Sequence, residues 1–168
     1  MKRLLIFVAI YAGALLQLYL PSWPLFAGAK PPVLMALALY CAFQQPRRGM
    51  WWPVGWAALL HDSLDPGPFG PAVLAFPLMA LLANRIRSEI FVDGLVTQLI
   101  CGALGGMFTT LVAALIYAIS GVRPASFVPT LMRFIGSGLL GMAVFPLVSM
   151  GMHALETALP KRRGYGWQ

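Results

Sequence analysis

The sequence predicts an all-α integral membrane protein, folded as a single transmembrane domain of six helices over residues 1–168. Three observations predict this fold. Apolar and aromatic residues make up 60% of the chain and charged residues 10%, whereas a soluble domain devotes about a quarter of its residues to charge. The apolar residues fall into six stretches separated by polar or turn-forming connections. The basic residues gather between those stretches, where the topology signals of membrane proteins lie.

The first two predicted helices cover about residues 4–20 and 31–44. A cleaved signal sequence is the alternative for the first, because residues 27–29 are small. Its apolar run is longer than the ~7–15 residues of a signal core, so we expect a retained helix. The second helix starts at Pro31 and Pro32, which suit a first turn because those positions need no intrahelical N–H bond.

Four further helices are expected at about residues 50–62, 70–84, 95–120 and 128–159. A turn-rich loop over residues 61–68 closes the third helix. The middle helices fall short of the ~20 residues that span a bilayer, so flanking residues or a locally thinned bilayer must make up the difference. The fifth and sixth helices are long enough to cross.

The basic residues predict an even number of crossings, with both termini in the cytoplasm. On this topology nine basic residues lie inside and three outside, which follows the positive-inside rule. The inner nine are Lys2, Arg3, Arg47, Arg48, Arg85, Arg87, Lys161, Arg162 and Arg163. The outer three are Lys30, Arg123 and Arg133. Removing one middle helix would carry an inner cluster to the outside.

Small residues form a stripe on the fifth helix and recur on the sixth. Helices in lipid associate largely through close backbone contact, so such residues predict a packing face. The residues of the stripe on the fifth helix recur at every fourth position, so they lie on one face of that helix. The predicted packing face consists of Gly102, Gly106, Thr110, Gly138 and Gly141. Packing within the bundle and packing against a partner helix both fit this pattern, and self-association stays open.

His61, Asp62 and Asp65 form a compact group of one imidazole and two carboxylates on the expected outer side. One interpretation is a cation or proton site, since ionisable groups near a membrane are often functional. The favoured interpretation is a solvated loop in which Asp62 or Asp65 caps the next turn, because this set makes a poor metal site. With no phosphate loop or triad arrangement, we expect no enzyme activity, cofactor or metal. The scattered basic clusters argue against nucleic-acid binding.

Three stretches of the sequence carry a family resemblance over essentially the whole chain. The first is a basic start and one apolar helix, followed by the proline-led segment 31–40. The second is Gly55-Trp56-Ala57-Ala58-Leu59-Leu60-His61-Asp62, which continues through a loop ending at Gly70 into another apolar helix. The third is Asn84-Arg85-Ile86-Arg87, before a long glycine-rich helix. In this order the stretches resemble the MreD family of bacterial rod shape-determining membrane proteins. The chain departs at Val33, where members often carry an acid.

The resemblance implies a fold similar to the substrate-binding subunits of energy-coupling-factor transporters. It also implies a non-enzymatic scaffold or adaptor of the cell-elongation complex in the bacterial inner membrane, which helps control cell shape and peptidoglycan synthesis. Such proteins bind the single-span protein MreC and associate with MreB, RodA and a class B transpeptidase. On this likeness, an outer pocket or partner socket is expected near His61, Asp62, Asp65 and Gly70. The alternative is a substrate-binding membrane subunit of a vitamin or metal transporter, with convergent polar residues around an outer cavity.

Overall fold

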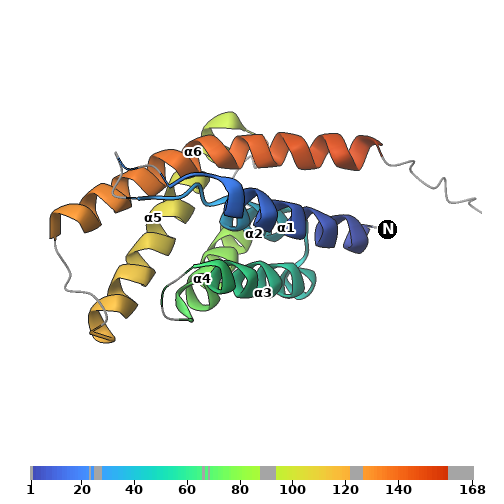
Figure 1. Cartoon of the computed structure of the whole chain (residues 1–168). Coiled ribbons are helices and arrows are strands. Elements are labelled where there is room, and N and C mark those ends of the chain that lie inside the picture. The colour runs from blue at the N-terminus through green and yellow to red at the C-terminus, as the bar shows by residue number, and fades with distance from the viewer. Residues whose placement is uncertain are drawn as a thin grey trace, which may run out of the picture.

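The computed structural model describes residues 2–22, 24, 28–65, 67, 69–87, 94–121 and 127–158. Over these residues it contains six α-helices and no β-strand, which confirms the predicted all-helical fold (Figure 1). The helices are α1 (Lys2–Tyr19), α2 (Val33–Gln44), α3 (Arg47–Leu64), α4 (Pro71–Ile86), α5 (Leu95–Ile119) and α6 (Phe127–Ala158). The basic cluster at residues 161–163 and the outer Arg123 lie outside the described residues.

Helix α3 is longer than expected, whereas the other helix ends lie within two residues of their predicted positions. It begins at Arg47 because Pro46 takes the N-cap position and its carbonyl accepts the Met50 amide at 3.2 Å. It continues to Leu64, after which the Asp65 amide still donates to the His61 carbonyl at 3.1 Å. His61 therefore lies on a helix and not in a loop.

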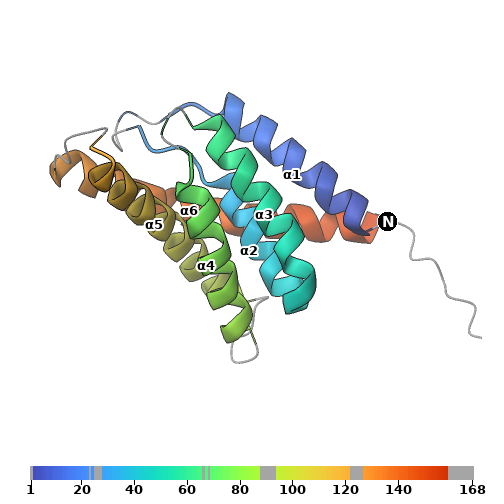
Figure 2. The same cartoon turned by 90° about the horizontal axis from the view of Figure 1, so that it is seen from below.

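Helix α2 forms the centre of the bundle. Eleven of its 12 residues, from Val33 to Phe43, are buried, and it contacts each of the other five helices. Figure 2 shows α2 behind α3, enclosed between that helix and α6. A helix that is apolar on every side is typical of a protein core or of a membrane span, and α2 lies in the core of this bundle.

Side chains from neighbouring helices cap both ends of α2. At its start, the backbone N–H of Leu34 donates to Oε1 of the buried Gln17 on α1 at 3.1 Å. At its end, Nδ2 of Asn84 on α4 donates to the carbonyls of Ala42 and Gln45 at 2.9 and 3.2 Å. Arg87 adds a bond to the Gln45 carbonyl at 2.7 Å. These bonds satisfy backbone groups that the helix itself leaves without partners.

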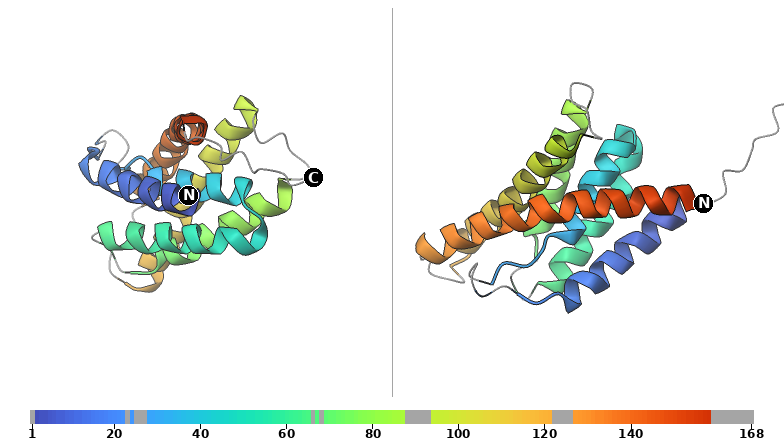
Figure 3. Two further views of the ribbon diagram at one scale, coloured as in Figure 1. Left: turned by 90° about the vertical axis from the view of Figure 1, so that its right-hand side faces the viewer. Right: turned by 90° about the horizontal axis from the view of Figure 1, so that it is seen from above.

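Helices α5 and α6 make the most extensive contact in the bundle. They have 25 and 32 residues and are the two described helices whose length and composition suit a membrane crossing; α1, α2 and α4 are apolar but shorter. More than half of the surface of Leu111, Leu115 and Leu147 is exposed, as is typical of a face that meets lipid or protein. Viewed from above, α6 runs the length of the bundle (Figure 3, right).

Candidate functional site

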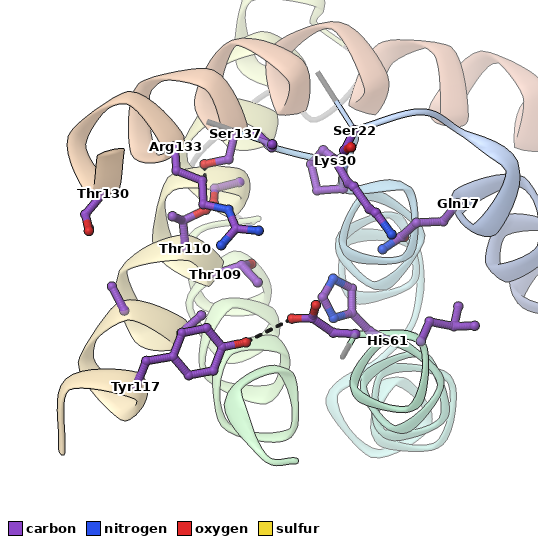
Figure 4. Close-up of a pocket in the computed structure, with 18 of the residues that line it drawn as sticks. Gln17, Ser22, Lys30, His61, Thr109, Thr110, Tyr117, Thr130, Arg133 and Ser137 are labelled. Carbon is purple, nitrogen blue, oxygen red and sulfur yellow. Dashed lines mark hydrogen bonds between the residues drawn. The ribbon is translucent and has the colours of Figure 1, made fainter. Parts of the chain in front are cut away.

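A cavity of about 570 Å³, lined by both apolar and polar side chains, lies at one end of the bundle, which we call the cavity end. This end comprises the last turns of α1, α3 and α5 and the first turns of α2, α4 and α6. Figure 4 shows side chains from α1 and α3 facing those from α5 and α6 across the space. The volume lies within the ~300–1,000 Å³ range of small-molecule sites.

Three polar residues of α6 line the cavity. Thr130, Arg133 and Ser137 are three and four positions apart, so they share one helix face. Arg133 lies six residues after Phe127, about 9 Å along the helix axis at 1.5 Å per residue. Its half-buried side chain points from α6 into the cavity (Figure 4). In the part of the chain that the structure describes, it makes no hydrogen bond or ion pair.

The hydroxyl groups on the α5 side are already hydrogen-bonded. Thr109 donates to the Gly105 carbonyl at 2.8 Å. Thr110 lies 3.1 Å from the Gly106 carbonyl and 2.7 Å from Oγ of Ser137, which in turn donates to the Phe134 carbonyl at 3.0 Å. These oxygens can still accept a hydrogen bond, but their protons are engaged within the protein.

The opposite wall contributes Gln17, Lys30, His61 and Asp65. Oδ2 of Asp65 accepts a hydrogen bond from the Tyr117 hydroxyl at 3.0 Å, which joins α5 to the end of α3 across the cavity (Figure 4). The His61 ring packs edge-on against Phe76 with ring centroids 5.3 Å apart. Its Nδ1 atom is buried and lacks a hydrogen-bond partner in the described chain.

Over the described residues, the cavity lining therefore carries more positive than negative charge. Lys30 and Arg133 are its cations and Asp65 is its carboxylate. No group of three or more His, Cys, Asp or Glu side chains in the described ranges could hold a metal ion. The arrangement is suited to binding a polar molecule, because it offers two cationic donors and several hydroxyl acceptors around one concave volume.

Asp62 and Gly70 do not line the cavity, although an outer pocket or partner socket was expected near them. The buried Asp62 carboxylate instead accepts the backbone N–H groups of Gly70, Ala72 and Val73 at 3.0, 2.9 and 3.1 Å. Gly70 has φ +130°, a conformation that L side chains rarely adopt. Asp62 thus caps α4, as the favoured interpretation expected, but it does so from a buried position in α3 and not from a solvated loop.

The predicted packing face divides into two parts along α5. At Gly102 and Gly106 an added Cβ would collide with the carbonyl oxygens of Gly141 and Ser137, so the two backbones are in direct contact. Gly138 faces the flexible side chain of Met107 and not the α5 backbone. Further along α5, Thr110 lines the cavity as well as bonding α6. The part of the stripe at Gly102 and Gly106 packs against α6, and the part at Thr110 forms a wall of the cavity.

Sequence reasoning placed His61 and Asp65 at an outer pocket but did not include Arg133, Lys30, Gln17 or Tyr117. These residues come from segments far apart in the sequence, so no spacing rule brings them together. The sequence does mark Arg133 as a candidate functional residue, because a charged residue inside an apolar helix is often functional. The sequence predicts only an inner loop at Asn84 and Arg87, whereas the structure shows that their side chains cap the end of α2.

Comparisons with known proteins return no relative: no family model matches the chain, and neither a curated protein nor a solved structure matches it.

Proposed function

We propose that this chain is a multi-pass protein of the bacterial inner membrane that acts as a non-enzymatic scaffold of the cell-elongation complex. Its six helices cross the bilayer with both termini in the cytoplasm and the cavity end outside. Following the resemblance to the MreD family, its direct partner is the single-span protein MreC, within a complex that includes MreB, RodA and a class B transpeptidase. In this role it holds a partner helix in the membrane and helps to control cell shape and peptidoglycan synthesis.

The observation that carries this proposal is the position of the three stretches behind the resemblance. The proline-led stretch forms the start of α2, whose Leu34 amide is capped by Gln17. The stretch ending at Gly70 supplies the Asp62 cap of α4. The third stretch supplies Asn84, which caps the end of α2. The residues that carry the resemblance are thus the ones that fix how the helices meet, which supports a shared fold.

The basic residues of the described helices support the proposed orientation. Arg47 and Arg48 lie at the start of α3, and Arg85 and Arg87 lie at the end of α4. All four belong to the end of the bundle opposite the cavity. Figures 1 and 2 place the start of α1 at that same end. Because arginine and lysine favour the cytoplasmic side, this end is assigned to the cytoplasm and the cavity end to the exterior.

Deletion of the gene from its native cell tests the proposed role. A rod-shaped cell should become round, and expression of the parent chain should restore the rods. Unchanged rods after complete deletion would contradict the scaffold role.

Photo-crosslinking tests the proposed partner directly. A benzoylphenylalanine placed at the exposed positions Trp56, Leu111 or Leu147 samples three outer faces of the bundle. At least one of them should capture MreC in intact cells, whereas the same probe at the fully buried Phe76 should not. If no exposed face captures MreC while the variants still accumulate in the membrane, MreC is not the partner.

A second candidate function, a substrate-binding membrane subunit of a transporter, is favoured by the cavity itself. That candidate requires convergent polar residues around an outer cavity, and it is supported by Lys30, His61, Asp65 and Arg133, which line one cavity. Co-purification separates the two candidates. A retained single-span protein supports the scaffold, whereas a retained small molecule together with loss of its uptake after deletion supports the transporter.

A further inference from the structure

We propose that the cavity binds an oxyanion, the phosphate or carboxylate group of a small molecule or of a lipid headgroup, with Arg133 and Lys30 as its anchors. This inference goes beyond the scaffold role. It also names a ligand chemistry for the cavity on which the transport candidate rests.

The position of Arg133 is the first reason. A guanidinium inside a membrane-spanning helix is costly, and such groups face a water-filled cavity or pair with an opposite charge. Arg133 lies within α6, points into the cavity and has no acidic partner among the described residues (Figure 4). A bound anion would supply the negative charge that the described residues do not place beside it.

The acids that the structure describes do not fill this role. The whole sequence contains five: Asp62, Asp65, Glu89, Asp93 and Glu156. Glu156 lies near the far end of α6, and the two acids between α4 and α5 lie outside the described residues. Of the two at the cavity end, Asp62 is engaged by three backbone N–H groups and Asp65 receives the Tyr117 hydroxyl. Among the described residues that line it, the cavity is left with one more cation than carboxylate.

The distribution of basic residues along the chain is a separate reason. Lys30 and Arg133 are two of the three basic residues expected on the outer side, where such residues are disfavoured. Both of them line the cavity. Both cations lie on the side of the membrane where basic residues are disfavoured, and both line one cavity. We therefore assign them to binding a ligand and not to setting the orientation of the helices in the membrane.

The lining of the cavity suits an organic anion. The guanidinium of Arg133 can bind two oxygens of a phosphate or carboxylate at once, and the Lys30 ammonium adds a second charge-assisted donor. The protons of Thr109 and Ser137 are directed to backbone carbonyls, whereas the two cations supply charged donors. Leu18, Leu64 and Ala113 provide apolar walls for the rest of the ligand.

Binding to the purified full-length chain in an uncharged detergent tests this proposal. The probes are glycerol 3-phosphate, succinate and phosphatidylglycerol, measured by thermal shift and by native mass spectrometry. At least one probe should bind saturably. Both Arg133→Gln and Lys30→Gln should raise its Kd about tenfold or more, as expected for the loss of one charge-assisted pair. The matched control is Arg85→Gln, an exposed arginine at the opposite end, which should leave the Kd unchanged.

The three probes also distinguish the source of the anion. Binding of the lipid alone identifies a headgroup site, and binding of a free anion identifies a soluble ligand. Lys30 is exposed in a connecting segment, so Lys30→Gln remains informative if Arg133→Gln fails to fold. The proposal is overturned if no probe binds the parent chain, if neither substitution weakens binding, or if Arg85→Gln weakens it equally. None of these results affects the outcome of the cell-shape experiment. The oxyanion site and the scaffold role can therefore be contradicted independently of each other.

Discussion

The Asp62 carboxylate accepts the backbone N–H of Ala72 at 2.9 Å, so the last turn of α3 is fastened to the first turn of α4. Both residues are buried, and two further amides, those of Gly70 and Val73, share the same carboxylate. A single side chain therefore satisfies three of the amides at this helix start. The turn between the helices depends on it, because these amides have no intrahelical acceptor.

We predict that Asp62→Ala lowers the free energy of unfolding by about 2–4 kcal/mol, since it removes a helix cap and leaves buried amides unsatisfied. Thermal unfolding of the purified chain in detergent measures the change. The control is Ser63→Ala, whose exposed hydroxyl bonds only the Leu59 carbonyl, and it should change stability by less than about 0.5 kcal/mol. Equal effects of the two substitutions would show that the cap does not hold α4.

We predict that Gly106→Leu disrupts the α5–α6 contact, at a cost of about 3 kcal/mol or more. Its Cβ would meet the Ser137 carbonyl, a backbone group that cannot rotate away, so the helices must separate. Gly102→Leu should behave alike, because its Cβ would meet the Gly141 carbonyl. Denaturation in detergent and complementation of the deletion strain are the two measurements.

The matched control for the glycine variants is Gly151→Leu on α6. No atom lies within 4 Å of the position that its Cβ would take, so the substitution should leave folding and cell shape unchanged. If Gly106→Leu is as stable and as active as Gly151→Leu, the two helices do not make the described backbone contact.

The number and order of the helices could be predicted from the sequence, because a helix that packs in an apolar environment must itself be apolar along its length. The start of α3 could not be predicted, because Arg47 and Arg48 resemble a polar connection between helices. In the structure Pro46 is the N-cap and the helix begins at Arg47. The Asp62 cap was one of two interpretations, and only the fold decides between them. The cavity could not be assembled from sequence, because Arg133 and His61 meet there through the packing of separate helices.

We predict that Gln17→Met destabilises the chain by about 1–3 kcal/mol, because methionine has nearly the same shape but cannot accept the buried Leu34 amide. The neighbouring Leu16→Met is the control, since that side chain is more than half exposed and should be replaceable at little cost. Thermal unfolding compares the two variants. Indistinguishable melting temperatures would mean that the start of α2 does not need this cap.

The most direct test of the proposed membrane arrangement is thiol accessibility in intact cells. Single cysteines at Ser22 and Ser120 report on the cavity end, and single cysteines at Arg47 and Arg85 report on the opposite end; all four positions are exposed. Cys41 and Cys101, both buried, are first replaced by alanine. We predict that an impermeant maleimide labels positions 22 and 120 in intact cells and labels positions 47 and 85 only after the membrane is opened. Labelling of positions 47 and 85 from opposite sides would contradict the six-crossing arrangement.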